Sequence, residues 1–161
     1  MDAGQFSRST KRLFKLAQDE ASLLAHGYIS TEHLFLAIFR FDSDLSDRLV
    51  TDLKISEEAM RNEIAKIIQL GEKTFSRPKQ FPLTFRAKRI VELAISESGL
   101  DAGNAVEPEH ILIGLVVEPD NEPTVVTQSF KNCGVDLETL LSLTRLYASN
   151  IDVSADTDSA R

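Results

Sequence analysis

Two Glu-His pairs are the residues of this sequence best suited to do chemistry. Glu32-His33 and Glu109-His110 lie at matching places in two similar stretches of the chain. A carboxylate beside an imidazole could work as an acid/base pair, and the two pairs together could share a metal ion. Neighbouring side chains on a helix point about 100° apart, so we do not expect a Glu and the next His to converge on one ion.

Two further interpretations of these pairs stay open. Both pairs are expected in the first turn of a helix, where Glu32 and Glu109 are stabilised by the positive end of the helix dipole. His33 and His110 would then pack inward or bond the backbone. Alternatively, the pairs recognise a ligand. A small helical enzyme that uses all four residues is the third hypothesis, which the divergence of neighbouring side chains disfavours.

Other catalytic and cofactor motifs are missing from the sequence. It has neither the Gly-x-x-x-x-Gly-Lys-Ser/Thr loop for nucleotide nor a Gly-x-Gly-x-x-Gly, a Gly-x-Ser-x-Gly, a His-Glu-x-x-His or a Cys-x-x-Cys. The single cysteine, Cys133, is predicted to be a small buried apolar residue rather than a nucleophile. We therefore expect no cofactor, no metal and no enzymatic activity.

An internal repeat predicts the architecture that must position the pairs. A shift of 77 positions matches the chain to itself without a gap through its most patterned stretch, as far as Leu115. The shift pairs Lys11-Arg12-Leu13 with Lys88-Arg89-Ile90, Leu16-Ala17 with Leu93-Ala94, and residues 32–38 with residues 109–115. Apolar residues exchange for apolar residues of similar volume, as equivalent core sites require. Leu16 and Leu93 are accordingly predicted to be buried equivalents.

Each half is predicted to form four helices. In the first half, one helix is predicted to follow a Ser7 cap, two to span 31–39 and 44–52, and one to follow a Ser56 cap. Gly27 is expected to end the first of them. In the second half, one helix is predicted to follow a Thr84 cap, one to have Pro108 in its first position, one to span 123–132 and one to follow an Asp136 cap. Strand patterns are nearly absent. The fold class is therefore all-α, with repeats at 6–71 and 83–149, a linker at 72–82 and a disordered tail at 150–161.

Composition excludes several classes of protein. The 161 residues are 42% apolar and 27% charged, as in a globular protein, and the formal net charge is -7. This acidic balance disfavours nucleic acid as a partner. The sequence has no apolar run of about 18 residues and no signal peptide pattern, so no membrane association is expected. With a single cysteine, this indicates the cytoplasm, or the stroma of a plastid.

The motifs around the pairs resemble a known family. Residues 27–38, Gly-Tyr-Ile-Ser-Thr-Glu-His-Leu-Phe-Leu-Ala-Ile, and the preceding 16–21 closely resemble the Clp N-terminal repeat. The second copy, at 84–94, looks most similar to the ClpC branch, and the resemblance covers 6–148. It implies a pseudo-twofold all-α domain of two four-helix units, monomeric in isolation. Such a domain docks substrate or adaptor proteins for an ATP-driven Clp ring and its ClpP-type peptidase.

The resemblance also implies a ligand. ClpC-type domains recognise phosphorylated arginine with the glutamate of a Thr-Glu-His motif, which corresponds to Thr31, Glu32 and His33, and to Glu109 and His110 in the second copy. A carboxylate can accept a forked pair of N–H bonds from guanidinium, and a helix N-terminus favours phosphate. Pro108 stands where the first copy has Thr31, so the second site loses a hydroxyl and an N–H donor.

Departures from the family pattern suggest a different partner. The segments 41–44 and 118–122 replace a Glu-Gly-Glu-Gly type of loop, and Gly103-Asn104 replaces Gly-His. The sequence contains no ATPase module. We expect either a piece of a full unfoldase or a stand-alone accessory or decoy subunit that binds the Clp ring or peptidase and tunes its assembly or ligand supply.

Overall fold

The computed structural model describes residues 3–41, 44–99, 103–117 and 122–159. Over these residues the chain forms helices and no strand, which confirms the all-α prediction. A short 3-10 helix, η1 (Ala3–Gln5), precedes the first α-helix. The α-helices are α1 (Arg8–Leu23), α2 (Thr31–Arg40), α3 (Asp44–Leu53), α4 (Glu57–Ile67), α5 (Phe85–Ser98), α6 (Pro108–Val116), α7 (Val125–Asn132) and α8 (Leu137–Ser159).

Most helices begin where the sequence predicts. The side chains of Ser7, Ser56, Thr84 and Asp136 accept hydrogen bonds from backbone N–H groups three residues later, at 3.1, 3.0, 3.2 and 3.0 Å. Each bond satisfies a donor that the first helical turn would otherwise leave without a partner. Pro108 occupies the first position of α6, where its missing N–H costs nothing. Local chemistry therefore sets these helix starts.

Three boundaries differ from the prediction. α1 ends at Leu23, before Gly27, because Ala25 adopts a left-handed backbone conformation with φ of 57°. α7 begins at Val125 behind a Thr124 cap rather than at 123. The tail predicted to be disordered from 150 instead continues α8 to Ser159. Extending a helix that has already formed needs no new nucleation, so a sequence without apolar periodicity can still be helical there.

The two repeats interlock through short backbone pairings. Phe6 forms a parallel bridge with Val106, and Ile29 forms one with Leu83. The 77-residue shift converts each bridge into the other with the repeats exchanged. The bonds agree: Ser7 N–H donates to Val106 O at 3.1 Å, and the equivalent Thr84 N–H donates to Ile29 O at 2.9 Å. The start of α2 therefore lies beside the start of α5, and the start of α6 beside that of α1.

The core follows the same pseudo-symmetry. Leu13 and Ile90 are completely buried, as are Ala17 and Ala94. Leu16 and Leu93 are equivalent to each other but only half-buried, so their prediction as core residues is wrong. They lie one helical step to the side of the buried stripe.

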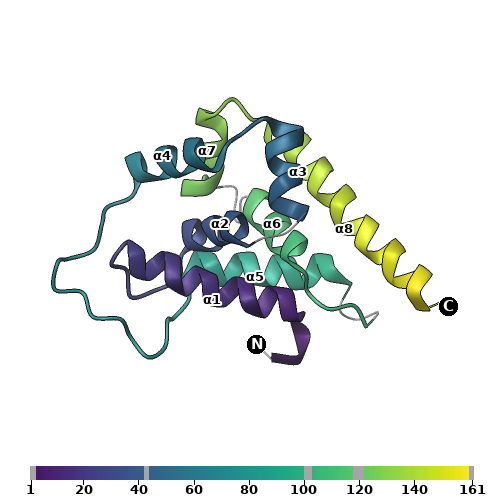
Figure 1. The fold of residues 1–161 in the computed structure, drawn as a ribbon, viewed down its shortest axis with the longest axis horizontal. Helices are drawn as coiled ribbons and strands as arrows, with labels where there is room; N and C mark the ends of the chain where they lie inside the picture. Colours follow the sequence, from purple (N-terminus) through teal and green to yellow (C-terminus); the bar gives the residue numbers. More distant parts are fainter. Residues whose placement is uncertain (1–2, 42–43, 100–102, 118–121, 160–161) are drawn as a thin grey trace.

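The central helices are α2 and α6, which pack against each other with α1 and α5 along one side and α4 and α7 paired beyond (Figure 1). α6 is buried at nearly every position, as expected for a helix that is apolar all round. A long connection links α4 to α5 (Figure 1), and Arg77 secures it through Asp19 at 3.1 Å and through the ring of Phe81. Within the described residues, no helix is long and apolar enough to cross a membrane.

Candidate ligand-binding site

Glu32 of the first Glu-His pair lines a pocket of about 380 Å³, which we call the Glu32 pocket. Both repeats build it, because the N-termini of α2 and α5 lie side by side there. Its walls come from these two helix starts and from the start of α7. The lining residues are Tyr28, Ser30, Thr31, Glu32, Thr84, Phe85, Arg86 and Val125.

Residues of opposite charge line the Glu32 pocket. Glu32 is only 7% exposed, and Thr31 Oγ1 donates to its Oε2 at 3.3 Å. Arg86, the second residue of α5, adds a guanidinium to the lining. Tyr28 and Phe85 are 42% and 73% exposed, so two aromatic rings flank this charged pocket. The arrangement suits a ligand that carries both a cation and an anion.

His33 supports the pocket rather than lining it. Its side chain is completely buried, and its Nδ1 accepts a 2.9 Å bond from the backbone N–H of Ser30. This bond leaves Nε2 of the neutral ring to carry the proton and to donate to His26 Nδ1 at 3.0 Å. His26 then donates from Nε2 to Gln69 O at 2.7 Å. These partners assign both tautomers and confirm that His33 packs inward and bonds the backbone.

A group of possible metal ligands lies beside this pair. Atoms of His26, Glu32 and His33 that could ligate a metal all lie within 4.8 Å of one another. Glu32 and His33 are consecutive residues of α2, and His26, on the loop before α2, supplies the third group. The histidine nitrogens, however, are all engaged in hydrogen bonds, and the bond from Ser30 N–H keeps the proton on His33 Nε2. A metal ion would have to displace this network, so the donor set does not fit one.

Burial keeps His33 neutral. Its pKa is lowered to about 4, mainly by removal from water and also by neighbouring His26. The carboxylates of Glu32 and Glu20 act in the opposite direction but are weaker in total. A neutral His33 holds the N-terminus of α2, and with it Glu32, in one position at physiological pH.

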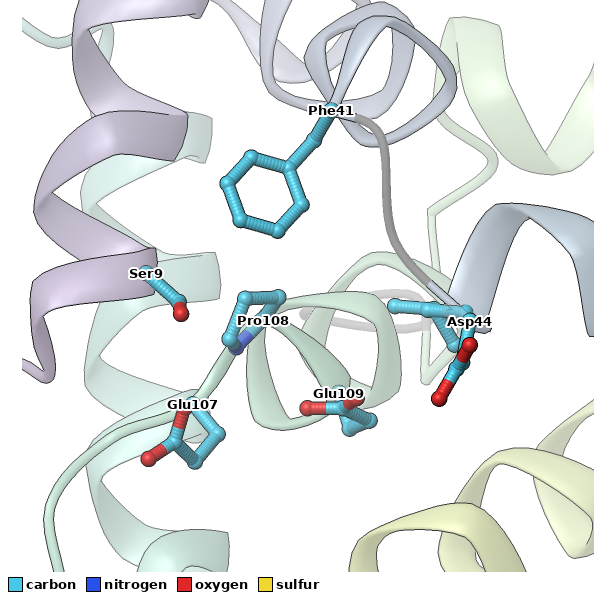
Figure 2. A pocket seen from close by; sticks show the side chains of 7 residues that line it. Ser9, Phe41, Asp44, Glu107, Pro108 and Glu109 are labelled. Carbon is cyan, nitrogen blue, oxygen red and sulfur yellow. The ribbon is translucent and has the colours of Figure 1, made fainter.

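The second Glu-His pair opens onto an equivalent cavity of about 270 Å³, the Glu109 pocket (Figure 2). It lies where α6 begins, beside the starts of α1 and α3. Its lining residues are Ser9, Phe41, Asp44, Leu45, Glu107, Pro108 and Glu109. The 77-residue shift relates Ser9 to Arg86, so the second pocket has a hydroxyl where the first has a guanidinium.

Glu109 lies in a different electrostatic environment from Glu32. Its Oε2 is buried and has no hydrogen-bond partner among the residues that the structure describes. Burial is the largest cause of its raised pKa, and Glu107 and Asp44 raise the pKa further by repulsion, while Arg48 lowers it. His110 repeats the role of His33, because its Nδ1 accepts from the N–H of Glu107 at 2.9 Å. Both repeats thus have the histidine bond to the backbone N–H before the helix, whereas the charged residues that line the two pockets differ.

Several residues of the site were not predicted from the sequence. Arg86, Tyr28 and Phe85 line the Glu32 pocket, and His26 completes its support. Arg86 and Phe85 come from the other repeat, so spacing within one motif gives no signal for them. The two-residue distance of Arg86 from the Thr84 cap places it in a first helical turn, like Glu32, and is the signal that could have found it. Residues 42–43 and 118–121 of the divergent loops lie outside the described residues.

Cys133 lies at the end of α7, where it is partly buried and packs against the core. Burial is the main cause of its raised pKa, with a further contribution from Glu63. A thiol with a raised pKa has less of the nucleophilic thiolate form, in agreement with the prediction that Cys133 is a packing residue.

The chain resembles known proteins over most of its length. A ClpA homologue described as an ATP-dependent Clp protease ATP-binding subunit, from Cyanidium caldarium, is 34% identical over 158 residues. ClpC/MecB of Bacillus subtilis, named a negative regulator of genetic competence, is 30% identical over 134 residues. The matches cover 98% and 83% of this chain but only 18% and 16% of those proteins.

Solved structures show the same fold. The N-terminal domain of the chaperone ClpD from Arabidopsis thaliana has a TM-score of 0.69 at 22% identity, covering 93% of this chain and 97% of that one. The Hsp104 N-terminal domain from Candida albicans also has a TM-score of 0.69, at 15% identity, covering 87% and 89%. Residues 5–130 match the family model of the Clp repeat N-terminal domain. The chain therefore belongs to the Clp repeat N-terminal domain family.

Proposed function

We propose that this chain is a non-catalytic docking domain that binds substrate or adaptor proteins for a Clp ATPase ring and its peptidase. The observation that carries the proposal is the Glu32 pocket, where a buried carboxylate and a guanidinium line one cavity. The histidine beside it is engaged on both nitrogens and holds the backbone, which leaves it no role as an acid or base. Binding, rather than turnover, is what this arrangement supports.

The ligand we propose is a phosphorylated arginine side chain on a partner protein. Its guanidinium would pair with Glu32, because carboxylate and guanidinium form forked, charge-assisted hydrogen bonds. Its phosphate would lie toward Arg86 and the N-termini of α2 and α5, where N–H groups and helix dipoles favour anions. One pocket would then match both charges of the ligand.

Calorimetric titration with phosphoarginine, with arginine as the control that lacks the phosphate, tests the ligand. Glu32→Gln removes the carboxylate charge with little change in shape, and we expect at least about thirtyfold weaker binding, as for loss of one partner of a buried charge pair. Glu109→Gln is the matched control in the other repeat and should change the affinity less than about threefold. Equal affinity of Glu32→Gln and the unmodified chain would refute the site.

The partner class needs a separate measurement. The immobilised chain, beside its Glu32→Gln variant, should retain arginine-phosphorylated proteins from an extract in which a protein-arginine kinase is active. Retention that does not depend on Glu32, together with stoichiometric Clp ring or peptidase subunits, would instead favour the accessory or decoy function.

A further inference from the structure

We infer that Arg86 is the anion-binding residue of the Glu32 pocket and that Glu122 competes with the ligand for it. The inference rests on the proposed function, in which this pocket receives a phosphorylated side chain. The protein itself supplies a competing anion, because an acidic side chain already accepts a hydrogen bond from the Arg86 guanidinium.

The contacts of Arg86 carry the first step. One terminal nitrogen, Nη2, donates to Glu122 Oε2 at 2.6 Å, and Nη1 donates to Pro123 O at 3.0 Å. A guanidinium has five N–H donors, so these contacts leave donors for another acceptor. Arg86 is also one of the residues that line the pocket. The Glu122 carboxylate thus lies where the guanidinium of Arg86 would attract any other anion.

The exposure of the ion pair carries the second step. Arg86 is 50% exposed and Glu122 is 68% exposed. Ion pairs this accessible to water contribute little to stability, so displacement of Glu122 is easy. A phosphate group has an average charge of about −1.5 to −2 near neutral pH, so it competes well against a single carboxylate. Glu122 therefore weakens anion binding moderately without blocking it.

The pocket of the second repeat has no arginine at the position equivalent to Arg86. Ser9 occupies the position equivalent to Arg86, and among the described residues no Lys or Arg lines the Glu109 pocket. A phosphate should therefore bind at the first pocket alone. The competition between Glu122 and the ligand then sets the affinity of the whole domain for anions.

Titration with inorganic phosphate, followed by NMR of the Arg86 side-chain Nε–H signal, tests the inference without phosphoarginine. Relief of an exposed ion pair predicts that Glu122→Gln binds phosphate about two- to fivefold more tightly than the unmodified chain. Glu92→Gln is the matched control, since it removes the same charge from a comparable exposed pair on α5, with Arg89 at 2.9 Å. It should leave the phosphate affinity unchanged. Arg86→Gln should abolish the saturable response of a nearby probe, the backbone amide of Thr84.

Two outcomes would overturn the inference. One is the absence of any saturable phosphate response at Arg86 in both the unmodified chain and Glu122→Gln. The other is an equal gain for Glu122→Gln and Glu92→Gln, which would reduce the effect to net charge. Phosphoarginine binding that depends on Glu32 could survive either result, so this failure is distinguishable from failure of the proposed function.

Discussion

The Glu32 and Glu109 pockets have the same scaffold and different chemistry. In both, a histidine at the third helical position accepts the N–H of the residue before the helix, at 2.9 Å. Around this shared anchor, the first pocket has Arg86 and a buried Glu32, whereas the second has Ser9 and an unpaired oxygen of Glu109. Arg86 and Ser9 lie outside the apolar core, so this position can change without disturbing it.

The core comparison gives the largest expected effect. Leu13 and Ile90 are equivalent and completely buried, so Leu13→Ala and Ile90→Ala should each lower the free energy of unfolding by about 2–5 kcal/mol. Half-buried Leu16→Ala should cost clearly less. Urea denaturation of the three variants measures this. A cost below about 0.5 kcal/mol for either buried residue would show that the two halves are not packed alike.

The close contact between α5 and α6 at Gly114 allows a second comparison of the two repeats. Gly114 faces Ile90 of α5, and an added Cβ would lie 2.6 Å from the carbonyl oxygen of Ile90. Gly114→Ala should therefore destabilise the fold by about 1–3 kcal/mol through overpacking. Its equivalent, Ala37, is the matched site, where Ala37→Gly should cost about 1 kcal/mol in helix propensity alone. Thermal unfolding compares the two, and a stabilised Gly114→Ala would contradict this close approach of α5 and α6.

The pH dependence of stability should differ between the repeats. His33 has a folded pKa of about 4 against 6.5 in the unfolded chain, so the unfolded chain binds more protons between these values and stability rises with pH. Acidification from about pH 7.5 to about pH 5 should lose about 2 kcal/mol of unfolding free energy from this residue. His33→Gln should remove that component, and His110→Gln should retain it; equal pH slopes in all three proteins would contradict this prediction.

Glu109 should act with the opposite sign. Burial raises its pKa, so the folded chain binds the extra proton and stability from this group is lost as pH rises through the folded pKa. Glu109→Gln should therefore be more stable than the unmodified chain above that pKa and lose the advantage in acid. Denaturant titrations across pH measure this difference. A destabilised Glu109→Gln at neutral pH would show that the carboxylate has a partner.

The helix caps should show the smallest effect and the closest similarity. Ser7 and Thr84 occupy equivalent positions and accept bonds from Thr10 N–H and Ala87 N–H. Ser7→Ala and Thr84→Ala should each cost about 1 kcal/mol. Chemical denaturation can resolve such changes. A cost several times larger for Ser7→Ala would mean that its second bond, to the Thr10 hydroxyl, matters more than the cap itself.

Local features were predictable from the sequence, and features made by both repeats were not. Ser56, Thr84, Pro108 and Asp136 act through neighbours within a few residues, so their helix starts could be predicted. Arg86 reaches the Glu32 pocket through the exchange of segments between the repeats, and no spacing rule within one motif contains that exchange. The half-buried position of Leu16 depends on which side of α1 meets α2, which the apolar period alone leaves uncertain by one helical step.

The paired bridges at Val106 and Leu83 also affect how the domain is made on the ribosome. Phe6 lacks its bridge partner until Val106 has been synthesised, and Ile29 lacks its bridge partner until Leu83 emerges. The Glu32 pocket is likewise incomplete before Thr84 and Arg86 appear. A nascent chain that stops within the first repeat would therefore lack both bridges and the complete binding pocket, which forms only after the second repeat is entered.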